Sequence, residues 1–257
     1  MAAANPSTSI ILFLILTLAY FMFKYYTKSP TVIKVWTMIY FLSLLVIQFF
    51  INLGLTSDIC GFKQYGIALQ TTFVPWILIF GTVNLLLMMF PSWLAPFSNT
   101  IGYLFAYITG VNGFFQSVLK DRKTLNLGAN QANMITAINN VYDDKSLLIN
   151  SMTNENVGNW WNSMKTGGLL KSGVGDAQFN ELTGFVKMKT EIAEFIWYAL
   201  TGILTTSVSY NAILNSGCTQ SVKEMEKRHN EYVEQEKKAE KAKQQKESGQ
   251  IVYKSYE

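Results

Sequence analysis

Charge is what the first half of this sequence lacks. The 257-residue chain contains 21 Lys and Arg residues and 17 Asp and Glu residues, but residues 1–119 hold only four of the former and one of the latter. A soluble domain needs many more charged side chains to keep its surface in water. The scarcity excludes a soluble fold for this half and predicts that it is embedded in a membrane.

Cysteine and histidine are also scarce. The chain has two cysteines, Cys60 and Cys218, and a single histidine, His229. Two cysteines so far apart in sequence exclude a disulfide framework and a structural zinc site. A lone histidine in a charged stretch has no nearby partner for Ser-His or Cys-His catalysis. The sequence therefore predicts no enzyme, no metal site and no cofactor.

Phosphate-binding and nucleic-acid-binding patterns are also missing. The glycine-rich stretch 167–175 lacks the glycine that a P-loop requires just before Lys171, so it is interpreted as a flexible loop. Asp143 and Asp144 are adjacent, so on a helix their carboxylates point in different directions, and they are interpreted as surface residues. The net charge of +4 is too dispersed for a nucleic-acid footprint. No nucleic-acid partner is expected.

Long apolar runs are what the sequence has in abundance. They predict transmembrane helices at about 8–26, 35–55, 73–90, 101–119 and 195–214. In the first run the lysines follow the apolar core, which favours a retained anchor with an outside N-terminus over a signal peptide. In the third, Pro75 falls in the first turn, where a missing N–H costs little. The prediction is an all-α polytopic membrane protein with four or five transmembrane helices, the first four in a bundle over 1–119.

Residues 101–119 decide the topology. The segment has no charged side chain and is long enough to cross a bilayer, which favours five spans. Lys and Arg residues near the span ends divide six inside and six outside for five spans, but eight inside and four outside for four, which favours four. Five spans separate Cys60 from Cys218, whereas four place them on one side, where they can pair. We predict five spans, and a disulfide between these cysteines would contradict that prediction.

Small residues and amides are the candidate packing residues. Gly102, Ala106 and Gly110 recur at every fourth position, a spacing that lets two helix backbones approach closely. Five amides within the predicted spans are expected to bond neighbouring helices: Gln48, Asn52, Asn84, Asn112 and Asn211. The alternative is that the last three line a pore.

Residues 120–194 form a polar region with partly amphipathic helices. Apolar residues at helical spacing predict an amphipathic helix from about 129 to 152. Residues 154–175 are expected to be a loop in which Trp160 and Trp161 are exposed or at the membrane interface. Asp176 is predicted to be the N-cap of a helix that leads toward the last span.

The C-terminal tail, residues 219–257, is rich in Lys and Glu. Pairs of opposite charge three or four residues apart favour a solvated helix. A heptad pattern that includes Val222, Met225 and His229 is too poor in apolar residues for a strong coiled coil. The tail is therefore predicted to be a charged single helix that contacts a neighbouring protein.

The chain resembles the multi-span inner-membrane and minor capsid proteins of large nucleocytoplasmic DNA viruses. The features concerned are the small neutral N-terminus, the packed apolar spans, the Asn/Thr-rich stretch NLGANQANMITAINNVYDD and the Lys/Glu tail. The resemblance implies a location in a virion inner membrane and capsid proteins as partners. It implies no functional residue.

Together with the missing catalytic groups, these features predict a structural membrane scaffold. It would link a lipid bilayer to a protein layer through 120–194 and 219–257, as part of a homo- or hetero-oligomer. One alternative is a small channel or carrier for an uncharged or weakly charged solute. Another is a membrane-anchored assembly factor that docks through its tail.

Overall fold

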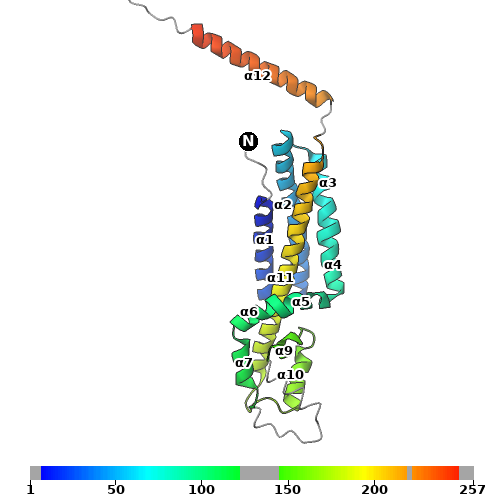
Figure 1. Ribbon diagram of the computed structural model, residues 1–257, viewed down its shortest axis with the longest axis vertical. Coiled ribbons are helices and arrows are strands. Elements are labelled where there is room, and N and C mark those ends of the chain that lie inside the picture. The colour runs from blue at the N-terminus through cyan, green and yellow to red at the C-terminus, as the bar shows by residue number, and fades with distance from the viewer. Residues whose placement is uncertain (1–6, 122–144, 219–221, 249–257) are drawn as a thin grey trace, which may run out of the picture. The chain divides into compact units, whose positions relative to one another are not determined.

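The computed structural model describes residues 7–121, 145–218 and 222–248. This part of the chain is helical apart from turns and one isolated β-bridge (Figure 1). It divides into two units, Met1–Asn215 and Ser216–Glu257. The all-α polytopic fold class predicted from the sequence is confirmed.

Four long apolar helices form the membrane bundle. They are α1 (Ser7–Tyr26), α2 (Pro30–Cys60), the continuous helix Tyr65–Met89 and α11 (Asp176–Asn215). All four are long and apolar enough to cross a membrane. They lie side by side in Figure 1, with α11 packed against the other three.

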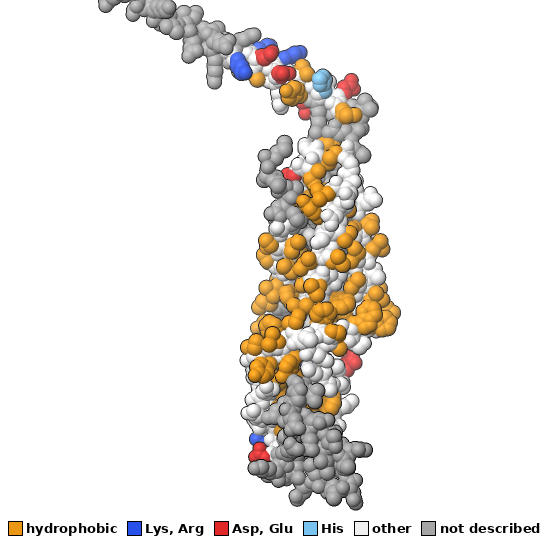
Figure 2. Space-filling model, viewed as in Figure 1, with side chains coloured by type: hydrophobic (Ala, Val, Ile, Leu, Met, Phe, Trp, Pro, Cys, Tyr) orange, Lys and Arg blue, Asp and Glu red, His pale blue; other side chains and the backbone are white. Residues whose placement is uncertain are grey.

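The exterior of this bundle is apolar. Orange side chains dominate the face of the bundle in Figure 2. Large side chains such as Leu42, Met88 and Leu204 are 57%, 71% and 55% exposed. A soluble protein rarely shows so extensive an apolar surface, whereas lipid tails solvate it well. The exposed side chains therefore mark the lipid-facing belt.

The third bundle helix starts earlier than the sequence predicts. It consists of α3 (Tyr65–Pro75), the π-helix η1 (Trp76–Gly81) and α4 (Thr82–Met89). Pro75 is thus inside the helix and not in its first turn. Proline lacks an N–H and clashes with the preceding turn. The backbone hydrogen bonds therefore change directly after it from the α-helical pattern to the wider π-helical pattern of η1.

Residues 101–119 do not form a transmembrane helix. After the short elements η2 (Pro91–Leu94) and α5 (Ala95–Phe97), the chain forms η3 (Ser98–Gly102), α6 (Tyr103–Ile108) and α7 (Val111–Val118). Gly110 separates α6 from α7 with a φ of 104°, a left-handed conformation that glycine adopts without steric strain. Neither helix reaches the roughly 20 residues of a membrane span. The five-span prediction is therefore wrong.

Both cysteines agree with four spans. Neither is free in the structure, since Cys60 and Cys218 are both disulfide-bonded. Within the bundle, α2 ends at Cys60 and α11 ends at Asn215, at the same end of the bundle (Figure 1). Four spans place both cysteines on one side of the membrane, whereas five would separate them.

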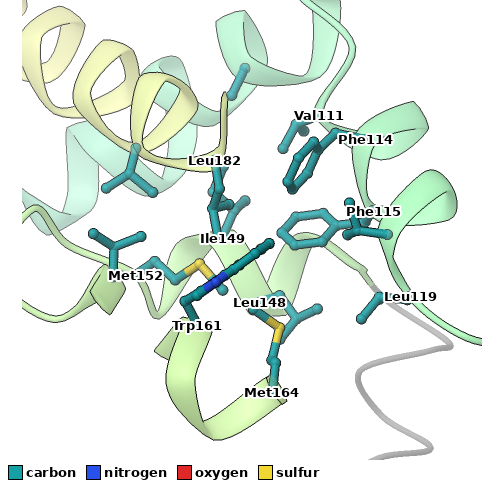
Figure 3. Close-up of a cluster of buried hydrophobic side chains, with 14 of the residues drawn as sticks. Val111, Phe114, Phe115, Leu119, Leu148, Ile149, Met152, Trp161, Met164 and Leu182 are labelled. Atoms are coloured by element: carbon teal, nitrogen blue, oxygen red, sulfur yellow. The ribbon is translucent and has the colours of Figure 1, made fainter. Parts of the chain in front are cut away.

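An extramembrane cluster surrounds the first half of α11. We use this name for the buried apolar residues of α6, α7, α9 (Lys145–Asn150), α10 (Val157–Thr166), the β-bridge and the start of α11 (Figure 3). Phe115, Ile149 and Leu182 are fully buried at its centre. The bridge between Leu119 and Leu170 closes the cluster on one side.

The predicted loop at 154–175 is partly wrong, because residues Val157–Thr166 are helix α10. Trp161 is only 6% exposed and lies 5.6 Å from the ring of Phe179. It shares one helix face with Val157 and Met164, which are also buried. That spacing is visible in the sequence, which therefore contains the amphipathic signal for this helix.

Two other predicted helices agree in part with the structure. Of the helix predicted at 129–152, residues up to 144 lie outside the described part, and α9 buries Leu148 and Ile149. The helix that follows Gly175 is continuous with the last span, as predicted. Asp176 is its first residue and not its cap. The side chain of Gln178 reaches back to accept a hydrogen bond from the Gly175 N–H at 3.0 Å.

The tail unit contains α12 (Val222–Ser248), a helix of 27 residues. Its described side chains are exposed, apart from the half-buried Val233. Lys227 and Glu231, four residues apart, form an ion pair at 3.8 Å. The predicted charged helix is present, and its contact with a neighbouring protein stays a prediction.

Candidate functional site at the junction of bundle and cluster

Polar pairs connect α1 to α2 along the bundle. The Ser9 hydroxyl donates to Gln48 Oε1 at 2.6 Å, and both side chains are buried. Toward the other end of α1, two hydroxyl pairs follow, Thr17 with Tyr40 at 2.8 Å and Tyr20 with Thr37 at 2.7 Å. In a hydrocarbon environment such bonds each stabilise helix association by about 1 kcal/mol.

The five amides named from the sequence have different roles. Asn52 donates to the Thr72 hydroxyl of α3 at 2.8 Å, so it bonds a neighbouring helix as Gln48 does. Asn84 donates to the Phe80 carbonyl of its own helix at 2.7 Å. Asn112 lies in α7, outside the four apolar helices, and Asn211 is exposed. Asn84, Asn112 and Asn211 therefore do not gather around a common path.

The three small residues at every fourth position, Gly102, Ala106 and Gly110, also differ in their surroundings. Gly102 packs directly on α11, because a Cβ atom there would lie 2.4 Å from the backbone oxygen of Lys189. Ala106 is completely buried in the extramembrane cluster. Gly110 has no atom within 4 Å of such a Cβ and instead ends the helical turn. Close helix packing thus holds for the first two residues and not for the third.

A second tight contact, with an aromatic side chain, occurs at a glycine that the sequence did not single out. A Cβ at Gly202 of α11 would lie 1.9 Å from the ring of Phe13 of α1. Phe13 is fully buried and also contacts Trp76 and Phe80 edge-on, with ring centroids 5.6 Å and 6.0 Å away. The aromatic centre of the bundle therefore depends on the missing side chain at Gly202.

Where the bundle meets the extramembrane cluster, three charged side chains join α1 to α11. Lys24 forms ion pairs with Glu191, at 3.1 Å, and with Glu194. The three side chains are only 14%, 14% and 20% exposed. Ion pairs of low exposure are screened little by water or salt, and loss of one partner leaves the other charge poorly solvated. This cluster of charges fixes the end of α1 on the middle of α11.

Lys187 reinforces the same contact. Its ammonium donates to the Tyr25 carbonyl at 2.6 Å and lies 5.2 Å from the centre of the Tyr25 ring. The Tyr25 carbonyl is in the last turn of α1, where helix carbonyls lack partners within the helix. Lys187 therefore acts as a C-terminal cap supplied by another helix.

Lys189 of α11 is buried where this helix contacts η3 and α9. Its side chain is 1% exposed, and its ammonium donates to the Ile149 carbonyl at 2.6 Å and to Asn99 Oδ1 at 3.2 Å. Both acceptors are neutral. A buried ammonium held only by neutral acceptors is unusual, because transfer of a charge out of water is strongly unfavourable unless it is paired.

The junction residues were missed because their signal is tertiary. Lys24, Glu191 and Glu194 were assigned to span ends or to a polar region, and 170 residues separate Lys24 from Glu194. One hint was available, since Glu191 and Glu194 are three apart on one helix face immediately before an apolar run.

The charged side chains at this junction hold neighbouring helices together through ion pairs and hydrogen bonds. Among the residues that the structure describes, no group of three His, Cys, Asp or Glu side chains could hold a metal ion. Comparison of the chain with protein-family models, curated proteins and solved structures finds no match.

Proposed function

We propose that this protein is a structural membrane scaffold that connects a lipid bilayer to a protein layer. The observation that carries the proposal is the continuity of α11, 40 residues that belong both to the extramembrane cluster and to the membrane bundle. At 1.5 Å per residue it is about 60 Å long, roughly twice the thickness of the hydrocarbon core. Because α11 packs against both the membrane bundle and the extramembrane cluster, it holds these two parts in a fixed relative position.

Charge and disulfide chemistry favour the same orientation. With four spans and the N-terminus outside, eight Lys and Arg residues near span ends are on the cytoplasmic side, among them Lys24, Lys28 and Lys187. The extramembrane cluster is then cytoplasmic. The ends of α2 and α11 face the opposite compartment, and disulfides such as those of Cys60 and Cys218 persist in oxidising compartments.

In this orientation the two extramembrane parts have different partners. The cluster would contact proteins on the cytoplasmic side, and the Lys/Glu-rich α12 would contact proteins on the other. Exposed Lys and Glu residues of α12 suit a partner surface that carries both signs of charge. A virion inner membrane beneath a capsid is one setting that combines a bilayer with a protein layer in this way.

Site-specific photocrosslinking in the native membrane tests the proposal. A crosslinker at Glu231 of α12, and another at Asn180 of α11, should each form adducts with defined proteins within the assembled particle. The matched control is Leu204, a lipid-facing position that should form lipid adducts only. Adducts that appear during assembly and vanish from the finished particle would favour the assembly-factor alternative.

Solute flux separates the scaffold from the channel alternative. Purified protein in liposomes should give no flux of small neutral solutes above that of empty vesicles. Measurable flux that is lost on an Asn84→Leu substitution, but not on Asn211→Leu, would overturn the scaffold in favour of a channel.

A further inference from the structure

A cavity of about 620 Å³ lies at the junction, within the bundle unit. Its wall combines the end of α4 and the turns after it, the segment that follows α9, and the middle of α11. This volume is in the range of pockets that bind small ligands. The wall includes the lipid-exposed Met88 and Met89 as well as the exposed polar residues Asn154 and Glu155. The cavity therefore lies at the depth where lipid tails give way to head groups.

Lys189 places one positive charge in the wall of this cavity, which also carries the carboxylates of Glu155 and Glu194. Its ammonium has three N–H donors, and the two recorded hydrogen bonds go to the neutral oxygens of Ile149 and Asn99. Within the described part of the chain, the ion pairs do not include Lys189. A buried ammonium without a counter-ion is energetically costly. An anionic ligand group in the cavity would supply one.

Two amide oxygens in the same wall lack a donor. Asn84 is 8% exposed, its Nδ2 is engaged by the Phe80 carbonyl, and its Oδ1 is buried without a hydrogen-bond partner. Asn150 Oδ1 is likewise buried and without a partner. Buried acceptors in folded proteins are nearly always satisfied. A ligand that carries N–H donors would satisfy both.

We propose that the cavity binds a group that combines a phosphate with a primary ammonium, as in the head group of phosphatidylethanolamine. The phosphate accepts from Lys189, and the ammonium donates to Asn84 and Asn150. Met88 and Met89 are placed to contact the lipid chains. A choline head group has no N–H donor for the two amide oxygens. A glycerol head group has hydroxyl donors but no cation to face the carboxylates of Glu155 and Glu194, so the site selects against both. This inference is independent of the scaffold proposal.

Native mass spectrometry of the purified full chain tests this site. Phosphatidylethanolamine, phosphatidylcholine and phosphatidylglycerol with identical acyl chains are titrated separately, and soluble phosphoethanolamine is titrated in a fourth series. Phosphatidylethanolamine should bind about tenfold more tightly than either other lipid, the effect expected for hydrogen bonds to a charged group. Asn84→Leu should remove most of this preference. The matched control, Asn211→Leu, changes an exposed amide outside the cavity and should leave the preference intact.

A second variant separates the two halves of the site. Lys189→Met keeps the aliphatic stem that packs on Gly102 but removes the charge that binds the phosphate, so it should weaken the binding of all three lipids alike. Soluble phosphoethanolamine binding as tightly as the lipid would support the site and identify a soluble source of the same chemistry. Equal binding of the ethanolamine and choline lipids to the unmodified chain would overturn the proposal, whether or not the variants fold.

Discussion

The two halves of α11 bury opposite kinds of side chain. In the extramembrane half, Leu182 and Val186 are buried while Asn180 and Glu181 are exposed, as in a water-soluble helix. In the membrane half the pattern is reversed. There three leucines are exposed, and most of the buried residues apart from Tyr198 and Ile213 are small or carry a hydroxyl group: Leu200, Leu204 and Leu214 against Thr201, Gly202, Thr205, Thr206 and Ser209.

The reversal follows from the solvent on each side. In water, burial of apolar surface drives packing, so leucine faces the core. In lipid, the surroundings are as apolar as leucine, so association depends on close backbone approach and on satisfied hydroxyls. Thr201, Thr205 and Thr206 each donate to a carbonyl four residues earlier, at 2.7–2.8 Å. The kind of side chain that α11 buries therefore changes along its length, and the change lies near Glu191 and Glu194.

The largest expected effect comes from the extramembrane cluster. Trp161→Ala removes a buried ring and should destabilise the cluster by about 3–5 kcal/mol. Hydrogen exchange should rise in α7 and α10 while α1 and α2 stay protected. Trp93→Ala is the matched control, since Trp93 is 46% exposed and should change exchange little. Simultaneous loss of protection in the bundle would show that the extramembrane cluster and the bundle are not stabilised independently.

A methyl group inside the bundle should have the next largest effect. Gly202→Ala forces a Cβ into the Phe13 ring and should destabilise the bundle by about 3 kcal/mol. Gly184→Ala, in the extramembrane half of the same helix, meets no atom within 4 Å and should be neutral or stabilising. Thermal unfolding in lipid nanodiscs measures both. Equal effects of the two substitutions would contradict the close approach of α1 and α11.

The charged junction between the two halves should contribute less. Lys24→Met leaves Glu191 and Glu194 without their partner and should destabilise the contact of α1 with α11 by about 2 kcal/mol. The double variant Lys24→Met with Glu194→Gln should recover part of this loss, because one uncompensated charge is removed. Unfolding midpoints of the four proteins in a double-mutant cycle give the coupling. A coupling of zero would contradict the ion pair.

The smallest effect should come from a single interhelical hydrogen bond. Gln48→Leu removes the bond to Ser9 and should destabilise the bundle by about 1 kcal/mol. Gln70→Leu changes an exposed amide on α3 and serves as its control. Helix association in nanodiscs, measured by steric trapping, would resolve the difference. A Gln48→Leu variant more stable than the unmodified protein would indicate that this bond is not a net stabiliser in lipid.

Thiol accessibility tests the four-span topology, which places the two halves of α11 in water and in lipid. Without reductant, a maleimide reagent should label neither Cys60 nor Cys218 in the denatured protein, and after reduction it should label both. The matched single variants Cys60→Ser and Cys218→Ser should each expose one reactive thiol. Labelling of two thiols without reduction would remove the disulfide support for four spans.

Some features were readable from the sequence because they are local. Lack of charge and run length determined the membrane bundle, and the Lys/Glu spacing determined the helix of the tail, since both depend only on neighbouring residues. The interhelical roles of Gln48 and Asn52 also followed, because an amide within a lipid-embedded helix has to find a partner nearby.

Tertiary structure decided the rest. Length and lack of charge alone made 101–119 a span, but Gly110 breaks the helix and the two pieces pack with α9, α10 and α11. The partners that make Lys24, Lys189 and Gly202 important lie elsewhere in the chain, so no local pattern could identify them. Sequence determines which segments can enter lipid, and packing against distant residues determines which of them do.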